Sequence, residues 1–540
     1  MAKNKPGFDP LDMNNYRIEK LPQMQKSNFE RWMAILGIPL AVLSFIVIYW
    51  FSDFSFLNNI EISADVIGAP ALKRFMALGE TEAIRIQEFT RINYAMLAIF
   101  VSSIILWITE AVPNYITSLI VILVVVLTQI TSEREAFAQL GHPVMWLNIL
   151  SFVLASMLVK TQVAKRFALN VMVKFGKSTS WIIFCFLVIN VVLSAFISAT
   201  TAKAAIMLPI FMVIAAMYGA TGGKNRNNFG RNLVLQNLFQ INVGATGFYT
   251  GAGAHLLAGA MMAQAMGWHL FSYQDWFIAA FPLSILLIFI AWFVGSKIMF
   301  PLKPEEREPQ IEGGIEYLKK ELQDMGKMSK EEYKSLAIFF LVLILWATDK
   351  VHGISPTTVA FGGAIVALLP RIGVVNWNDV DIPWHLMLFS AGAYVLGSGF
   401  SATGLPNILV NSGIDFLGID QGTPFWVVFL LLTFLMLFSA IIFQSKTVRT
   451  LIFVPIALST EQKLNLPPLS IAFPVALLIN HVYVLPFNSK PAALLYTTDQ
   501  YSWGDTFKFG MVMMVISWGM IILWGETVLR WLGYTEGIFF

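Results

Sequence analysis

Apolar stretches of about 20 residues recur along the whole of this 540-residue sequence, and an α-helix needs about that length to cross a bilayer. Hydrophobic residues make up 57% of the chain and charged residues only 13%, whereas soluble domains have roughly 25% charged residues. Inside a bilayer every backbone polar group must be bonded within the protein. The sequence therefore predicts an all-α polytopic membrane protein.

The remaining bulk properties exclude several other classes. A net charge of +3 gives no support for nucleic-acid binding. The single cysteine, Cys185, lies in an apolar run, so the fold has no intramolecular disulfide. The charged residues near the start are not followed by an apolar segment, so we expect no cleavable signal peptide.

Two short polar runs interrupt long apolar sequence. The first is Ser-Ala-Thr-Thr at 198–201, and the second is Gln-Ser-Lys-Thr at 444–447. Each is typical of the tip of a hairpin that enters the bilayer and turns back, and such a tip cannot face lipid. We therefore predict re-entrant hairpins at 181–217 and 425–460 whose tips line one cavity enclosed by protein.

The order of segments is repeated in the two halves of the chain. A broken apolar segment follows each hairpin, at 232–266 (split by GATGFYTGAG) and at 470–500 (split by LPFNSKP). Residues 94–300 and 335–540 each hold five spans and one hairpin, and an odd number of spans forces the two copies into opposite orientations. About 11 spans in an inverted repeat, with a site at discontinuous helices near the midplane, is the plan of many secondary transporters.

A weak internal similarity supports this repeat. Trp-Ile-Thr-Glu at 107–110 parallels Trp-Ala-Thr-Asp at 346–349. We interpret the acidic residues of these motifs, Glu110 and Asp349, as helix caps near the membrane interfaces.

Three further segments complete the predicted organisation. Residues 1–32 form a polar N-terminal segment, and 33–93 hold the first span and an extramembrane excursion. Residues 301–334 form a polar linker whose latter part is an amphipathic helix.

Lysine and arginine are distributed unevenly among the predicted loops. They are frequent in 165–178, 221–231 and 301–334, and absent from 266–275 and 404–424. Cytoplasmic loops carry an excess of these residues. We therefore place the N-terminus in the cytoplasm and the C-terminus outside, in a bacterial inner membrane.

A set of motifs resembles those of the divalent anion/sodium symporter family of carboxylate and sulfate transporters. The motifs are Trp107-x-Thr109-Glu110-Ala111-x-Pro113, Ser198-x-Thr200, Met207-Leu208-Pro209, Thr403-Gly404-Leu405, Ser445-x-Thr447 and Leu485-Pro486. The resemblance implies a homodimer in which a transport domain of hairpins and broken helices moves against a fixed scaffold. It also implies dicarboxylates, citrate or sulfate as substrates, usually driven by sodium.

The sequence departs from the family at the sodium motifs. Hairpin tips of the family read Ser-Asn-Thr, but the middle residues here are Ala199 and Lys446. The family has Thr-Pro-Pro-Asn turns in the broken helices, where this chain has Ala-Gly-Ala-His at 252–255 and Ser-Lys-Pro-Ala at 489–492. Asparagines are therefore missing, and two lysines, Lys446 and Lys490, are gained.

Hydroxyls, helix N-termini and these lysines make up the predicted anion site. Hydroxyl donors and free backbone amides at helix starts attract carboxylates, although serine and threonine in membranes also bond within their own helix. Lysines can extend from a helix end to the interface, but a charge near the membrane centre is costly and usually functional. The predicted substrate-binding residues are Ser198, Thr200, Thr201, Ser445, Lys446, Thr447, Asn488, Ser489 and Lys490.

Four other residues are assigned to the surroundings of this site. Lys203 and Arg449 lie one turn beyond the tips, where they either reach the anion or face an aqueous vestibule. Thr250 lies in the first glycine-rich break. His255 is a titrating group or a hydrogen-bonded filler, and we favour the filler. We predict no metal ligand and no cofactor.

The alternative classes are an enzyme and a channel. The sequence has no His-Glu-x-x-His motif and no Gly-x-Ser-x-Gly motif, and a channel does not need inverted repeats with matching polar breaks. A sodium/proton antiporter requires buried carboxylates, which 232–266 and 470–498 lack. The sequence thus favours a secondary transporter.

A lysine can attract an anion as bound sodium would, but it cannot leave afterwards. We therefore predict sodium-independent exchange of di- or tricarboxylates by an elevator-type mechanism, with Lys446 and Lys490 replacing sodium. The alternative is a sodium- or proton-coupled carboxylate or sulfate symporter.

Overall fold

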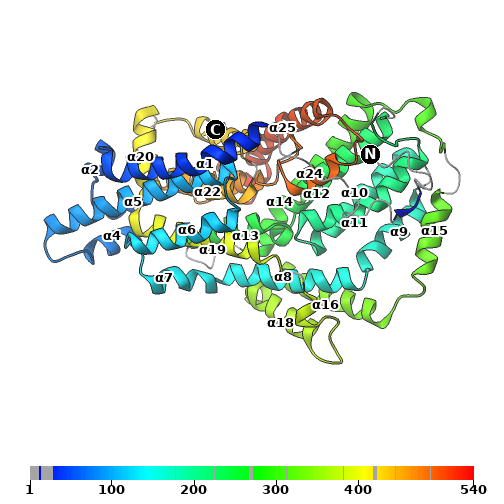
Figure 1. Ribbon diagram of the computed structural model, residues 1–540, viewed down its shortest axis with the longest axis horizontal. Helices are drawn as coiled ribbons and strands as arrows, with labels where there is room; N and C mark the ends of the chain where they lie inside the picture. The colour runs from blue at the N-terminus through cyan, green and yellow to red at the C-terminus, as the bar shows by residue number, and fades with distance from the viewer. Residues whose placement is uncertain are drawn as a thin grey trace.

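The computed structural model describes residues 11–13, 28–176, 178–223, 226–266, 272–310, 314–380, 382–417, 422–443, 445–486 and 488–539. Within these ranges the chain is built from helices, and most of the long ones run along the longest axis of the molecule (Figure 1). The predicted all-α polytopic fold is confirmed.

The helices of the first half, in chain order, are α1 (Asn28–Ile46) with its π-helical continuation η4 (Val47–Phe51), α2 (Ser55–Asn58), α3 (Ala64–Ile67), α4 (Ala69–Met76), α5 (Glu82–Thr109), α6 (Asn114–Leu127), α7 (Glu133–Ala138), η5 (Gln139–Gly141), α8 (Pro143–Lys160), α9 (Val163–Phe175), α10 (Thr179–Phe196), α11 (Thr200–Met217), α12 (Asn228–Thr246), η6 (Tyr249–Gly251), α13 (Gly253–Ala265), α14 (Tyr273–Phe293) and η7 (Val294–Met299).

The linker and the second half contain η8 (Pro304–Glu306), α15 (Gly314–Asp324), α16 (Lys330–Ala347), α17 (Asp349–His352), α18 (Pro356–Leu368), η9 (Trp377–Asp379), α19 (Trp384–Thr403), α20 (Leu405–Leu417), α21 (Phe425–Phe438), η10 (Ser439–Ile441), α22 (Lys446–Lys463), α23 (Ala472–Leu477), α24 (Lys490–Tyr496), α25 (Trp503–Glu526) and α26 (Val528–Trp531).

Seven of the described helical segments are long and apolar enough to cross a membrane on their own. They are Arg31–Phe51, Glu82–Thr109, Glu133–Lys160, Thr200–Met217, Tyr273–Met299, Trp384–Thr403 and Trp503–Trp531. Four shorter apolar helical segments add to them in the described ranges: Asn114–Leu127, Trp181–Ala195, Pro356–Leu368 and Phe425–Ile441.

Several helices begin at a serine followed three residues later by an acid. Ser272 Oγ accepts from the Asp275 amide at 3.1 Å, and the Asp275 carboxylate accepts from the Ser272 amide at 3.0 Å. Ser329 and Ser502 start α16 and α25 in the same way. These capping boxes satisfy free amide groups, so they fix where the helices begin.

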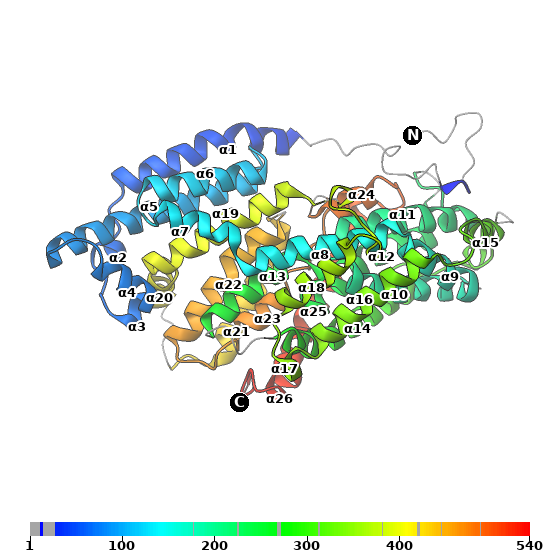
Figure 2. The same ribbon diagram turned by 90° about the horizontal axis from the view of Figure 1, so that it is seen from below.

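Different predicted loops lie at the two ends of the molecule. Helices α2 and α4 lie at one end of the long axis and α9 and α15 at the other in both views (Figures 1 and 2), and Figure 2 shows α3 beside α4. The Lys165 ammonium of α9 donates to Glu321 of α15 at 2.9 Å, and Lys160 pairs with Asp379 at 2.7 Å. Lys165 and Glu321 belong to 165–178 and 301–334, which are both expected on the cytoplasmic side, and their contact shows that these two segments lie together.

Predicted outer segments are joined in the same manner. Asp349 is 6% exposed, and its carboxylate accepts from the Tyr273 amide at 2.7 Å. Asp349 thus accepts from the first amide of α14, in the other half, while Ser272 is the N-cap of that helix.

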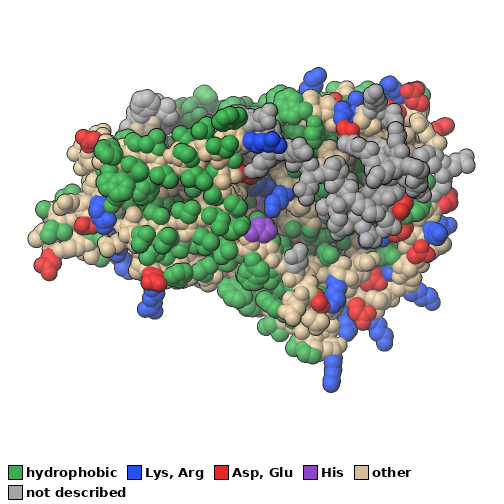
Figure 3. Space-filling view, viewed as in Figure 1, with side chains coloured by type: hydrophobic (Ala, Val, Ile, Leu, Met, Phe, Trp, Pro, Cys, Tyr) green, Lys and Arg blue, Asp and Glu red, His purple; other side chains and the backbone are tan. Residues whose placement is uncertain are grey.

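The surface has an apolar part and a charged part. Hydrophobic side chains cover much of the face in Figure 3, whereas charged side chains gather toward the end that carries α9 and α15. This distribution fits a membrane-embedded body with a charged end outside the bilayer.

One predicted boundary differs from the structure. We placed the end of the extramembrane excursion at 93, but α5 begins at Glu82 and is continuous to Thr109. Its first turns are polar, so hydropathy detects only the embedded part of a helix that extends beyond the membrane.

Candidate functional site

The first hairpin consists of α10 and α11, joined by extended residues at 197–199. Ser198 lies in this turn and is 9% exposed, and its hydroxyl has no hydrogen-bond partner among the described residues. Thr200 and Thr201 start α11 and are half-buried. The tip therefore holds an unpaired hydroxyl beside the free amides of a helix start.

The second hairpin consists of α21 with η10 as its first arm and α22 as its second. Ser445 precedes α22, and its hydroxyl accepts from the Val448 amide at 3.3 Å. Lys446, the first residue of α22, is half-buried and donates to Asn242 Oδ1 of α12 at 2.8 Å. Thr447 is half-buried beside it. The tip of the second hairpin thus contacts the broken helix of the first half.

Each broken segment is two helices separated by irregular backbone. In the first half, α12 and α13 are separated by residues 247–252, which include η6. In the second half, α23 and α24 are separated by residues 478–489. Helices α13 and α24 begin at Gly253 and Lys490, and both of these residues are exposed.

The hairpins and broken helices interlock across the two halves. Helix α12 packs against both arms of the first hairpin, and α23 packs against both arms of the second. The second part of each broken helix packs against the hairpin of the other half: α13 packs against α22, and α24 packs against α11. Each hairpin therefore contacts both broken helices, as expected for one site built from two halves.

Lys203 and Arg449 are completely buried and bond to protein atoms. The Lys203 ammonium donates to Ser194 Oγ at 2.9 Å and to the Ile241 carbonyl at 3.3 Å. It thereby joins the first arm of its hairpin to α12. Neither Lys203 nor Arg449 forms an ion pair with a carboxylate in the described ranges.

Arg449 plays the corresponding part in the second hairpin. Its guanidinium donates to Ser439 Oγ at 3.0 Å, to the Ile479 carbonyl at 3.0 Å and to the Met436 carbonyl. These contacts join η10 and the end of α21 to the break after α23. The sequence placed Lys203 and Arg449 near the site, but did not indicate that each ties a hairpin to its broken helix.

The other predicted residues of the second break are bonded locally. Asn488 accepts from the Leu485 amide and donates to the Ala440 carbonyl, both at 2.5 Å. Ser489 caps α24, accepting from the Ala492 amide at 3.3 Å and donating to the Val482 carbonyl at 3.2 Å. Their substrate contacts stay predictions, as does that of the exposed Lys490.

Thr250 lies in the first break and His255 in the first turn of α13, and they are 4% and 0% exposed. His255 Nδ1 lies 3.4 Å from the Phe248 carbonyl, and its ring packs on Trp276 with 4.9 Å between centroids. This environment favours the filler interpretation of His255.

Three polar residues near the tips were not predicted. Asn242, the partner of Lys446, is fully buried. Asn480 and His481 in the second break are at most 1% exposed, and their side-chain nitrogens and oxygen have no described hydrogen-bond partner. Both His255 and His481 lie within electrostatic range of Lys446. A polar pair inside an otherwise apolar segment was the available signal in the sequence.

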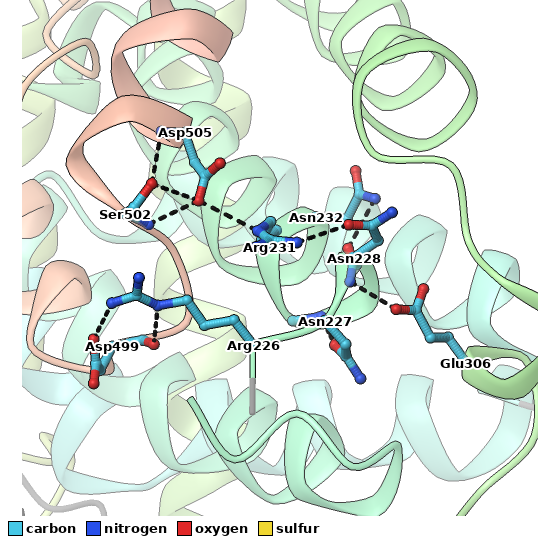
Figure 4. A network of polar contacts seen from close by, with 10 residues as sticks. Arg226, Asn227, Asn228, Arg231, Asn232, Glu306, Asp499, Ser502 and Asp505 are labelled. Carbon is cyan, nitrogen blue, oxygen red and sulfur yellow. Dashed lines mark hydrogen bonds and ion pairs between the residues drawn. The ribbon is translucent and has the colours of Figure 1, made fainter. Parts of the chain in front are cut away.

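A second polar network lies where α12 begins (Figure 4). Arg226 pairs with Asp499, and Arg231 Nε lies 3.2 Å from the Asp505 carboxylate. The backbone N–H of Asn228 donates to Glu306 Oε1 at 2.9 Å. This network joins the first broken helix to the loop before α25 and to the linker.

The fold and site define a polytopic membrane protein in which two helical hairpins and two broken helices pack on one another, with the basic residues Lys203, Lys446 and Arg449 at the hairpins. The family described as "Sodium:sulfate symporter transmembrane region" matches residues 87–535. The chain belongs to this family, and it is a membrane-embedded transporter and not an enzyme.

Individual relatives match most of the chain. A sodium-dependent dicarboxylate transporter of Staphylococcus saprophyticus is 27% identical over 457 residues, covering 80% of this chain and 86% of that protein. The transporter of the same name from Staphylococcus aureus is 26% identical over 438 residues, covering 77% and 82%. A membrane protein of Cupriavidus necator is 26% identical, covering 81% and 88%.

A solved structure also aligns with the chain. It is the YdaH transporter of Alcanivorax borkumensis, with a TM-score of 0.48, 12% identity, and coverage of 94% of this chain and 99% of that one.

Proposed function

We propose that this transporter exchanges di- or tricarboxylate anions across the membrane by an elevator-type alternating-access mechanism that does not require sodium. The observation that carries the proposal is the position of Lys446 at the second hairpin tip, with its ammonium 2.8 Å from an uncharged asparagine oxygen of the other half. Because this partner is neutral, no carboxylate offsets the charge of the protonated ammonium, which can therefore attract an incoming anion.

The surroundings of Lys446 support binding of an anion. The unpaired hydroxyl of Ser198 and the amides at the starts of α11 and α22 are hydrogen-bond donors. Lys203 lies within electrostatic range of Lys446, and Arg449 lies behind the same tip. Dicarboxylates are the first class to test, because two of the relatives are named as dicarboxylate transporters.

Exchange follows from the fixed nature of these charges. A sodium ion neutralises a bound anion and then leaves, whereas a lysine ammonium stays in the emptied site. Moving that uncompensated charge through the membrane interior is costly, so the site returns at lower cost with a second anion bound. The chain belongs to a family described by its sodium coupling, and it carries Ala199 and Lys446 at the tips where the family has asparagine.

The packing of the helices into separate groups supports an elevator-type mechanism. Hairpins and broken helices pack on one another as described above, while α1, α5, α6 and α19 form a second packed group and α8, α16 and α18 a third. We propose that the hairpins and broken helices form the moving unit of each protomer in a homodimer, with the N-terminus in the cytoplasm of a bacterial cell.

Transport by purified protein in liposomes tests this function. Liposomes loaded with unlabelled succinate, citrate or sulfate are diluted into the corresponding labelled anion, with and without a sodium gradient and at several pH values. We expect uptake that saturates, requires an internal carboxylate and is unaffected by sodium. Strong uptake into empty liposomes energised by sodium or by protons would instead establish a symporter.

A matched pair of lysine variants locates the charge. Lys446→Met should abolish exchange, because it removes the charge at the tip. Lys508→Met, at an exposed lysine of α25, should leave exchange unchanged. Equal activity in the two variants would contradict the assigned role of Lys446.

A further inference from the structure

Helix α12 carries a row of carboxamides that the proposed transport cycle does not use. Asn228, Asn232, Gln236 and Gln240 recur at every fourth position, so successive members lie one above another on the helix surface. Asn228 is half-buried and belongs to the network of Figure 4, whereas the other three are 1% exposed. The row therefore leads from the surface into the core.

Part of the row is bonded within the protein. Gln236 Nε2 donates to Asn232 Oδ1 at 3.0 Å, and Asn232 Nδ2 donates to the Phe300 carbonyl at 2.7 Å. Asn190 of α10 donates to Gln240 Oε1 at 2.9 Å and to Asn237 Oδ1 at 2.8 Å. Such bonds hold membrane helices together, but they account for only some of the polar atoms. We call Asn228, Asn232, Gln236, Gln240 and Asn190 the amide row.

Three buried atoms of the amide row have no described partner. They are Gln236 Oε1, Gln240 Nε2 and Asn190 Oδ1. A buried polar atom that is left unpaired is energetically costly. The set contains two hydrogen-bond acceptors and one donor. A bound cation would need only acceptor atoms around it, and a bound anion only donors. Water both donates and accepts, and it commonly occupies such positions in protein interiors.

Glycines border the row where side chains of neighbouring helices would otherwise intrude. A Cβ added to Gly295, in the π-helical end of α14, would lie 2.8 Å from Gln236 Nε2 and 2.9 Å from Asn232 Oδ1. The next position of the row after Gln240 is Gly244, where an added Cβ would lie 3.3 Å from Ser194 Oγ. Ser194 is the residue that accepts from Lys203.

Lys203 lies at the inner end of the amide row. Its ammonium has three donors, of which two are used by Ser194 and Ile241 in the described ranges. An ammonium buried without its full set of hydrogen bonds is strongly disfavoured. A water molecule at this end would supply the third acceptor.

We propose that the amide row binds internal water molecules and that this water connects the surface network of Figure 4 with the buried ammonium of Lys203. The water satisfies the unpaired carboxamide atoms and supplies a hydrogen-bond partner to the lysine nitrogen. Only the consequence for anion exchange depends on the proposed function; the water site itself does not.

Radiolytic footprinting of the intact protein in lipid nanodiscs tests the site. Short X-ray pulses convert bound water into hydroxyl radicals that oxidise adjacent side chains. Phe509 is 2% exposed and borders the same space, because its ring lies 3.4 Å from the Cβ position of Gly295. Phe211 of α11 is 0% exposed and packs on Phe186 in the hydrophobic core, so it serves as the matched control.

We expect oxidation of Phe509 to exceed that of Phe211 several-fold. Equal, low oxidation of the two phenylalanines in the wild-type protein would overturn the proposal, and this comparison needs no variant. The readout is independent of transport, so it separates failure of the water site from failure of the proposed function.

A double variant then tests whether the water is bound by the amide row. In Gln236→Leu/Gln240→Leu the oxidation of Phe509 should fall to the level of Phe211, while oxidation of Trp503, which is 50% exposed, should not change. Undiminished oxidation of Phe509 in a folded variant would place the water elsewhere and contradict the assignment.

Discussion

The serines of the two hairpin tips have different environments although they occupy matching places in the sequence. Ser445 is the N-cap of α22, whereas the hydroxyl of Ser198 has no described partner. Removing a cap costs about 1 kcal/mol of folding free energy, but an unpaired hydroxyl contributes no such bond.

The two serine variants should therefore separate stability from binding. Ser445→Ala should lower the melting temperature, while Ser198→Ala should leave it unchanged. Ser198→Ala should weaken apparent anion affinity by roughly fivefold, which corresponds to about 1 kcal/mol. Unchanged affinity in Ser198→Ala, measured by counterflow, would remove this hydroxyl from the site.

Arg449 depends on the planar shape of its guanidinium. It bonds atoms of η10, α21 and the second break at once, and a lysine ammonium cannot reproduce this fork. Arg449→Lys should lower the melting temperature, because buried carbonyls lose their donors at about 1–3 kcal/mol each. The control is Arg134→Lys at an exposed position, and equal melting of the two variants would contradict the structural role.

The sequence located the tips but not the partners of their residues. Ser198 and Lys446 interrupt apolar runs, and this pattern is visible without a structure. The bond from Lys446 to Asn242 joins residues 204 positions apart, and no local pattern indicates it. For the same reason the sequence could not show that Asn488 bonds to backbone of the second hairpin.

At the scale of elements, the helix bounds agree closely with the expected hairpin ranges, while the re-entrant path through the membrane stays a prediction. The first was expected at 181–217 and spans α10 and α11, and the second was expected at 425–460 and ends with α22 at Lys463. Abrupt changes between apolar and polar sequence mark these boundaries. The early start of α5 was missed because that signal disappears where a helix leaves the membrane.

Glu461 connects the second hairpin to the second broken helix. Its carboxylate accepts from the amides of Leu469 at 2.9 Å and of Ile471 and Ala472, each at 2.6 Å. These amides lie at the start of α23, where free donors need acceptors.

Replacing this carboxylate should loosen the junction. Glu461→Gln places a donor where only acceptors fit, so we expect a lower melting temperature and faster hydrogen exchange in α23. Glu305→Gln, at an exposed glutamate of the linker, should alter neither. A Glu461→Gln protein as stable as the wild type would show that the contact is dispensable.

Arg166 connects α9 to the linker. It donates to the Gly326 carbonyl at 2.8 Å and to the Met325 carbonyl at 3.0 Å beyond α15, and it pairs with Glu332. Burial acts to raise the pKa of Glu332, but hydrogen bonds from Arg166 and Ser329 outweigh it and leave this pKa below its ordinary value of 4.5.

The sign of this pKa shift predicts a pH dependence. Because the pKa is lower in the folded protein, the stabilisation is complete above about pH 4.5 and is lost as the pH falls through the folded pKa. Glu332→Gln should therefore melt below the wild type at pH 7, and the difference should shrink in acid. A difference in melting temperature that is constant from pH 7 to pH 4 would contradict this account.

At the scale of the whole molecule, the two halves contribute unequally to one centre. Three basic residues, Lys203, Lys446 and Arg449, lie at the hairpins without a carboxylate partner in the described ranges. The order of the segments and its repetition in the two halves predicted that the hairpins and broken helices of both halves would lie together. How the moving unit packs against the rest depends on contacts between distant helices, which composition and periodicity do not specify.

The central claim is that these fixed charges make anion exchange obligatory, and efflux from preloaded liposomes tests it most directly. Purified protein is reconstituted with labelled succinate inside and diluted into sodium-free buffer, with or without external succinate. The account predicts rapid efflux only when external succinate is present, because the empty, charged site does not return. Equally fast efflux into buffer that contains no anion would contradict it.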